Sequence, residues 1–217
     1  MPKGFSTVEA AVEAIAAGRL VIVLDAVERE NEGDLIAAAE KVTPQTIHFM
    51  ISQGRGQVCM PVLSDTADRL KLQTMVAAPN IQMPNFTIPI DHRRAKTGIS
   101  PVERAATVRA VIDPASRPDD FVRPGHLFPL VAKDRGVLAR PGHTEAAVDL
   151  ARLAGLLPAA VLCEICSSNG LHMAGREELM RLASRFRMPL ITIDALIEYR
   201  RQREAQAPAP CAIASAG

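Results

Sequence analysis

Short apolar runs alternate with helical patterns along most of this chain, and that alternation limits the folds it can adopt. Strands are predicted at residues 20–24, 35–39, 57–63, 86–90, 159–165 and 190–192. Helices are predicted after Ser6, from Pro44 to about Gly54, and at 101–109, 144–153, 177–186 and 194–203. Alternating elements of this kind are typical of a layered α/β or α+β fold.

The ends of several helices carry capping signals. Ser6 and Glu9 form a capping-box pattern before the first helix, and Gly18 closes that helix. Thr43 followed by Pro44 starts the second helix. A second capping box, Ser100 with Glu103, starts the helix that we expect to reach about Arg109.

Length limits the number of domains. The 217 residues fit one large domain with a sizeable core, and no internal repeat or interior linker divides them. We expect this domain at residues 1–203, followed by an Ala- and Pro-rich tail at 204–217 that we predict to be disordered.

Charge and hydropathy exclude some classes of function. With a formal net charge of +1, the chain lacks the excess of positive charge that is expected of a nucleic-acid binder. No apolar stretch approaches the ~20 residues of a membrane span, and the N-terminus does not resemble a signal peptide. We therefore expect no nucleic-acid or membrane partner and a cytoplasmic location. Cys163 and Cys166 have CxxC spacing, but without a second pair we do not favour a zinc or redox site.

An acidic segment, Arg29 to Asp34, follows the apolar run 20–24 directly. It contains one arginine and three carboxylates in six residues, more charge than a surface loop needs. This concentration predicts chemistry on an anionic substrate with the help of a metal ion. A carboxylate with one imidazole, completed by water and substrate oxygens, suits Mg²⁺ or Mn²⁺ better than zinc.

A second candidate segment, Arg140 to Glu145, precedes the helix predicted at 144–153. The backbone N–H groups of Gly142 to Glu145 can face an anion together with the positive end of the helix dipole. Arg140 adds a fork of donors suited to phosphate. The alternative is an ordinary helix start with a surface histidine at position 143.

His126 and Glu164 are the candidates for proton transfer. His126 lies in a Pro-Gly-His-x-Phe-Pro segment that we interpret as a glycine-containing turn, which could equally be purely structural. Glu164 interrupts an apolar strand near its carboxyl end, where open α/β sheets tend to place ligands. Burial there would raise the pKa of the carboxyl group and suit it to acid/base work. The alternative is an edge-strand glutamate that faces water.

Together these segments resemble 3,4-dihydroxy-2-butanone 4-phosphate synthases. The resemblance covers about residues 5–200 and is carried by DAVERENEGD (25–34), GISPVER (98–104), PGHLFPL (124–130), RPGHTEAAVDLARLAG (140–155) and Cys163-Glu164-Ile165. It implies an α+β domain with a mixed sheet and flanking helices, acting as a homodimer with Mg²⁺, or alternatively Mn²⁺. The implied reaction converts D-ribulose 5-phosphate into 3,4-dihydroxy-2-butanone 4-phosphate and formate, a lyase step of riboflavin biosynthesis.

The resemblance also implies roles for individual residues. Glu30 and His143 would hold the metal ion, and His126 and Glu164 would form the acid/base pair with Asp34 as a further catalytic group. The residues that would contact substrate are Arg29, Glu30, Asp34, Thr97, Arg140, Pro141, Gly142, His143, Thr144 and Glu164. The acidic segment, flexible through Gly33, would close over the substrate and exclude water.

The chain departs from the family pattern at several places. Ala26 and Val27 replace acidic residues, the loop 91–97 is unusually basic, and the segment 166–173 differs in sequence and length. Two alternatives therefore stand beside the synthase interpretation. One is a paralogue that acts on a related sugar phosphate, and the other is a non-catalytic regulator that binds a sugar phosphate.

Overall fold

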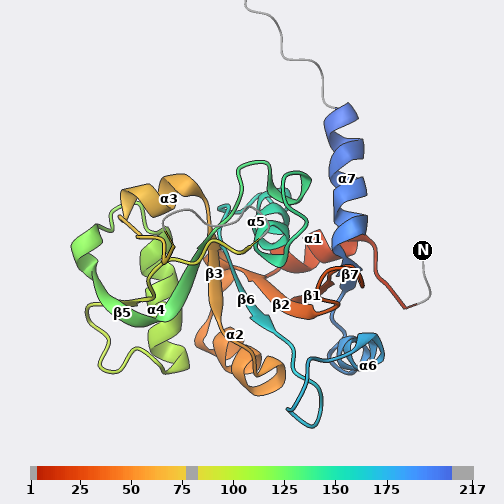
Figure 1. The fold of residues 1–217 in the computed structure, drawn as a ribbon, viewed down its shortest axis with the longest axis horizontal. Coiled ribbons are helices and arrows are strands. Elements are labelled where there is room, and N and C mark those ends of the chain that lie inside the picture. Colours follow the sequence, from red (N-terminus) through yellow and green to blue (C-terminus); the bar gives the residue numbers. More distant parts are fainter. Residues whose placement is uncertain (1–3, 77–82, 207–217) are drawn as a thin grey trace, which may run out of the picture.

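A computed structural model describes residues 4–76 and 83–206 of the chain (Figure 1). Seven strands form one mixed sheet in the order β4-β5-β3-β6-β2-β1-β7. The strands are β1 (Val21–Leu24), β2 (Gly33–Ala38), β3 (Cys59–Val62), β4 (Ile90–His92), β5 (Phe121–Val131), β6 (Ala160–Glu164) and β7 (Leu190–Thr192). The prediction of an α+β domain with a mixed sheet and flanking helices is confirmed.

Helices cover both faces of the sheet. They are α1 (Val8–Ala16), α2 (Pro44–Phe49), α3 (Ser64–Arg69), α4 (Pro101–Ile112), α5 (His143–Leu153), α6 (Arg176–Phe186) and α7 (Ile193–Gln206), with a π-helical turn η2 (Met50–Gly54) and short 3-10 turns η1 (Ala39–Lys41), η3 (Pro118–Asp120) and η4 (Gly136–Leu138). Among the described residues, no helix is both long enough and apolar enough to cross a bilayer.

The core consists of two apolar clusters, one on each face of the sheet. Strand side chains alternate between the faces, so Leu35 and Ala37 of β2 enter one cluster while Ile36 and Ala38 enter the other. The first cluster packs under α2, α4 and α6, and the second packs under α1, α5 and α7. Every residue of β1, β2 and β3 is buried.

A buried ion pair joins two helices on the α5 face. Arg200 of α7 places its Nη1 atom 2.5 Å from Oδ2 of Asp149 in α5, and the Asp149 side chain has no exposed surface. The same carboxylate oxygen accepts a hydrogen bond from the backbone N–H of Val137. Desolvation raises the pKa of Asp149, and these two partners oppose the shift.

Most predicted elements are present, with four corrections. Helix α1 is capped by the hydroxyl of Thr7, which accepts from the N–H of Ala10, and Ser6 instead pairs with Leu190 of β7. The strand predicted at 86–90 begins at Ile90. The histidine segment 124–130 lies within strand β5 rather than in a turn. Helix α7 continues to Gln206, so residues 204–206 of the predicted tail are helical; residues 207–217 lie outside the described part.

Candidate active site

A cleft of about 300 Å³ opens where the carboxyl ends of β1 and β6 meet the N-terminus of α5. Seven residues predicted for the site line it: Arg29, Glu30, Asp34, Arg140, His143, Thr144 and Glu164. Both walls carry polar groups, while Cys59, Leu130 and Leu162 of the apolar cluster under α5 form part of the lining. The structure therefore brings the predicted residues of three separate segments, 29–34, 140–144 and the end of β6, into one cleft.

Residues 29–32 of the acidic segment lie in the loop of a β-hairpin between β1 and β2, and Gly33 and Asp34 begin β2. Asp25 holds the loop in shape, because its carboxylate accepts the backbone N–H groups of Glu30 and Glu32 at 3.3 and 2.8 Å. The Arg29 guanidinium adds ion pairs of 2.7 Å to Asp25 and 2.6 Å to Glu30. Sequence reasoning missed Asp25, although its position directly after strand β1 was a usable signal.

Gly33 does not serve as a hinge. It lies in strand β2, where it pairs with Leu24, and a Cβ atom at this position would lie 2.6 Å from Cδ1 of Leu179. The absence of a side chain at Gly33 therefore lets helix α6 pack closely against the sheet. The expectation that Gly33 makes the acidic loop flexible is wrong.

Asp34 and Glu164 are register partners on the antiparallel strands β2 and β6. The neighbouring pair is hydrogen-bonded, with the N–H of Ile165 donating to the carbonyl of Gly33, so Asp34 and Glu164 form the closer, non-hydrogen-bonded kind of pair. Asp34 is 2% exposed, and its Oδ1 atom has no hydrogen-bond partner among the described residues. Desolvation, followed by the charge of Glu164, raises the pKa of Asp34 well above its ordinary value.

His143 begins helix α5 and points its ring into the cleft. Its Nε2 atom lies 3.1 Å from the carbonyl oxygen of Val23, which fits an N–H donor at this atom and a lone pair at Nδ1. The Nδ1 atom lies 3.9 Å from Oδ1 of Asp34. Burial lowers the pKa of His143 and favours the neutral imidazole, the form that binds metal ions.

The residues present fit a divalent cation. Asp25, Glu30 and His143 each offer a ligand atom, and these atoms lie within 4.8 Å of one another. The unpartnered Oδ1 of Asp34 adds a buried acceptor beside His143. Two or more carboxylates with one imidazole form an oxygen-rich donor set that suits Mg²⁺ or Mn²⁺.

The N-terminus of α5, the helix that His143 begins, forms another part of the cleft. Gly142 is the N-cap residue and has no side chain to accept a hydrogen bond from the first N–H groups of the helix, while Thr144 in the first turn lines the cleft. Arg140 is held by a buried 2.6 Å ion pair to Glu145, and the guanidinium lies so close to Gly142 that a side chain there would collide with it. Pro141 and Gly142 are not among the residues that line the cleft, and their contact with substrate stays a prediction.

Glu164 ends strand β6 and is half-buried. Its Oε2 atom accepts a 2.7 Å hydrogen bond from the backbone N–H of Gln57. Gly56 packs against the same side chain, and a Cβ atom there would lie 2.6 Å from Oε2. The carboxylate is therefore fixed by backbone from a segment more than 100 residues away in the sequence.

His126 and Thr97 do not line the cleft of a single chain. His126 instead pairs with Asp91 of β4, whose Oδ2 lies 2.7 Å from Nδ1 and whose Oδ1 accepts the backbone N–H of His126 at 2.9 Å. Thr97 donates its hydroxyl to Glu103. Asp91 was missed because its strand was predicted to end one residue earlier. The His126 side chain is 46% exposed.

The two sulfur atoms nearest the site are not poised for chemistry. Cys59 lines the cleft, and Cys163 precedes Glu164 on the other face of β6. Burial raises the pKa of both thiols, that of Cys163 to about 12, with Glu164 as the next cause. Both thiols are therefore protonated at neutral pH, and in the structure Cys59, Cys163 and Cys166 are free cysteines.

The fold and the cleft define a class of protein: a mixed-sheet α+β domain with an acidic, imidazole-containing ligand site at the carboxyl ends of strands. A sequence model of the 3,4-dihydroxy-2-butanone 4-phosphate synthase family matches residues 9–199. The chain belongs to this family.

Relatives agree with the family match. The riboflavin biosynthesis protein RibBA of Bacillus cereus is 52% identical over 201 residues, which cover 92% of this chain and 50% of that protein. A 3,4-dihydroxy-2-butanone 4-phosphate synthase of Wolinella succinogenes is 50% identical over 198 residues, with 91% and 57% covered. The chain thus spans about half the length of the curated relatives it matches.

Solved structures share the fold. The two-domain 3,4-dihydroxy-2-butanone 4-phosphate synthase RibBX of A. baumannii superposes with a TM-score of 0.86 and 45% identity, covering 90% of this chain and 58% of that one. A 3,4-dihydroxy-2-butanone 4-phosphate synthase in complex with two magnesium ions superposes with a TM-score of 0.86 and 35% identity, covering 94% of this chain and 100% of that one.

Proposed function

We propose that this protein is a lyase of riboflavin biosynthesis that converts D-ribulose 5-phosphate into 3,4-dihydroxy-2-butanone 4-phosphate and formate. The observation that carries the proposal is the cleft itself, which combines acidic side chains and the His143 imidazole with the N-terminus of α5, the helix that His143 begins. A sugar phosphate needs both, a metal-binding group for its hydroxyl and carbonyl oxygens and a helix N-terminus for its phosphate.

The proposed metal is Mg²⁺, with Mn²⁺ as the alternative, held by Glu30 and His143. Support comes from the grouping of these side chains with Asp25 and from the two magnesium ions in the similar synthase structure. When bound, the ion would act as a Lewis acid that stabilises negative charge on neighbouring substrate oxygens.

The protein's own residues have separate proposed tasks. Thr144, Arg140 and the backbone at Gly142 would bind the phosphate, with Pro141 fixing their approach, and Arg29 would contact substrate from the acidic loop. Glu164 and His126 would move protons as C3 is deprotonated, the C1 hydroxyl leaves as water, the skeleton migrates and a water molecule then releases C4 as formate. Asp34, with its raised pKa, is a third group able to hold a proton beside Glu164.

We further propose a homodimer in the cytoplasm. The support for a dimer is that His126 and Thr97 lie outside the cleft of their own chain, so a second copy would have to bring them to it. Exposed apolar side chains lie nearby: Val122 is the β5 register partner of Asp91, and Ile99 and Val102 lie beside Thr97. Their exposed fractions are 51%, 51% and 62%, as expected for an association surface.

A mixing experiment tests the shared site. Glu30→Ala and His126→Ala proteins would each be inactive alone, and refolding them together should restore about a quarter of the activity if each site takes one residue from each chain. No restoration, with dimers present by light scattering, would place both residues in a site formed by one chain.

The activity test is formate release. Purified protein is incubated with D-ribulose 5-phosphate, with Mg²⁺ or with EDTA, and formate is measured by a coupled assay. Metal-dependent formate supports the synthase. Bound ribulose 5-phosphate without formate would instead favour the paralogue for a related sugar phosphate or the non-catalytic regulator.

A further inference from the structure

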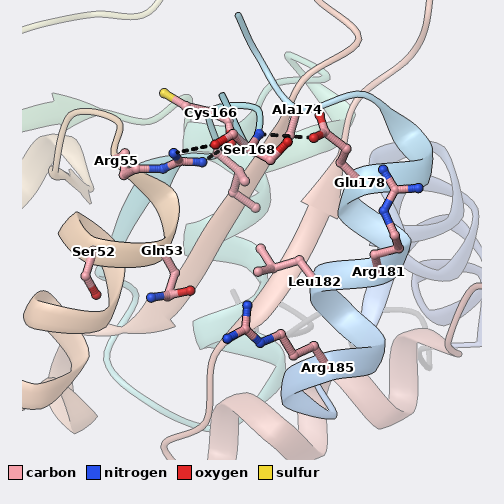
Figure 2. Close-up of a pocket in the computed structure, with 11 residues that line it drawn as sticks. Ser52, Gln53, Arg55, Cys166, Ser168, Ala174, Glu178, Arg181, Leu182 and Arg185 are labelled. Atoms are coloured by element: carbon pink, nitrogen blue, oxygen red, sulfur yellow. Dashed lines mark hydrogen bonds between the residues drawn. The ribbon is translucent and has the colours of Figure 1, made fainter. Parts of the chain in front are cut away.

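A second pocket, larger than the cleft, lies on the opposite face of the sheet at the end of β6. Its volume is about 610 Å³, and it is bordered by the turn η2, the segment that follows β6, and helix α6 (Figure 2). Glu164 lines the cleft, whereas the next two residues, Ile165 and Cys166, line this pocket. The two pockets are therefore distinct, and they lie close together at the end of strand β6.

The lining of this pocket carries an excess of positive charge. Arg55, Arg181 and Arg185 contribute to it, against the single carboxylate of Glu178. Glu178 accepts the backbone N–H of Ser168, and hydrogen bonds from Ser168 lower its pKa. Arg181 has only a 3.7 Å contact with the exposed Glu177. Among the described residues, Arg55 and Arg185 form no ion pair with a carboxylate.

Arg55 lines the pocket and has an unfavourable, left-handed backbone conformation. It caps η2 with a φ of 68°, in the left-handed region that favours glycine. Its guanidinium donates to the carbonyl oxygens of Cys166 and Ser167, at 3.0 and 2.5 Å, and so presents its charge at the pocket wall. π-Helical turns and strained backbone of this kind occur often at functional sites.

Figure 2 shows how the other groups are arranged. Arg185 extends from α6 toward Gln53 of η2 on the facing wall, and Leu182 points into the space between them. Guanidinium and amide donors on facing walls suit a phosphate group. The volume lies in the range of small-molecule sites, about 300–1,000 Å³, so it exceeds what a bare ion requires.

We propose that this pocket binds a small phosphate monoester. Arg185 and Gln53 hold the phosphate, the charge of Arg55 favours its entry, and the organic part packs against Leu182. This site is separate from the phosphate position proposed in the cleft and does not depend on the reaction proposed there.

Cys166 provides a local readout of occupancy, because it lines the pocket and is only partly buried. Full-length protein is treated with N-ethylmaleimide, and alkylation of the Cys166 peptide is followed by mass spectrometry. Ribose 5-phosphate and inorganic phosphate are compared with sodium chloride at equal ionic strength. Ribose 5-phosphate at twice its dissociation constant should slow alkylation about threefold.

Matched variants identify the arginine requirement. Arg185→Gln should abolish the protection, and Gln53→Ala should weaken it, with folding checked by circular dichroism. Arg201→Gln, an exposed arginine of α7 outside the pocket, should leave protection unchanged. Absence of protection in the unmodified protein, or protection that survives Arg185→Gln, would overturn the proposal. Equal protection by inorganic phosphate would overturn the assignment of an ester.

Discussion

Asp34 and Glu164 face each other across two neighbouring strands, so the protein places two carboxyl groups together in the wall of its cleft. Desolvation of the buried Asp34, followed by the like charge of Glu164, raises the pKa of Asp34, so its ionised form costs stability. A site that binds a cation recovers part of this energy when the cation arrives.

Asp34→Asn should stabilise the metal-free protein while removing formate production. In the folded protein the pKa of Asp34 lies above its value of ~3.9 in an unfolded chain, so the folded state binds this proton more tightly. Stability is therefore present below about pH 4 and is lost as the pH rises through the folded pKa. The asparagine cannot ionise, and we expect it to gain on the order of 1 kcal/mol at neutral pH.

Urea unfolding in EDTA at pH 4 and pH 7.5 measures this difference, with the exposed Asp119→Asn as control. The advantage of Asp34→Asn should grow with pH. An advantage that is the same at both values would show that the carboxyl charge is not its cause.

Asp91→Asn should lower turnover about 10²-fold with a smaller effect on KM, because general acid/base groups contribute on that scale. Asp91 fixes the ring of His126 through the 2.7 Å contact at Nδ1. Steady-state formate kinetics give kcat and KM, and a kcat equal to that of the unmodified protein would leave Asp91 a purely structural role.

Gly33→Ala should destabilise the protein by about 1–3 kcal/mol, the usual range for overpacking a core. The added methyl group would meet the fully buried side chain of Leu179 at 2.6 Å. Gly175→Ala is the matched control, since a Cβ atom added there would meet no neighbouring atom within 4 Å, and it should cost less than about 0.5 kcal/mol. Equal losses in the two variants, measured by urea denaturation, would contradict the packing argument.

Arg200→Met should cost about 3 kcal/mol, the lower end of the range for leaving a buried charge without its partner. The Asp149 side chain has no exposed surface, and after the substitution it would keep the hydrogen bond from the N–H of Val137 and the 3.7 Å contact with Arg152. Arg201→Met removes an exposed arginine from the same helix and should change the unfolding free energy by less than about 0.5 kcal/mol. Thermal and urea unfolding of the two variants give the comparison.

The sequence predicted the central strands and every helix except α3 (Ser64–Arg69), because those signals are local. The capping hydroxyl and proline at Thr43 and Pro44, the Ser100 cap and the glycine that closes α5 each act within a few residues. Strand β5 was missed because Pro124, Gly125 and Pro129 interrupt its alternating pattern, although the partner strands β3 and β4 supply the pairing that compensates. Capping and periodicity are short-range, whereas strand pairing is not.

The sequence by itself was enough to identify the acidic loop, the helix start at His143 and the glutamate that ends β6 as candidate site groups. In each case a reactive side chain lies next to a local signal for a strand end or a helix start. Only the tertiary structure decided which of these groups meet. Asp34 is set opposite Glu164 by strand register, Gln57 holds Glu164 across more than 100 residues, and His126 pairs with Asp91 rather than lining the cleft of its own chain. Contacts of this range depend on how the whole sheet is ordered, which no single segment specifies.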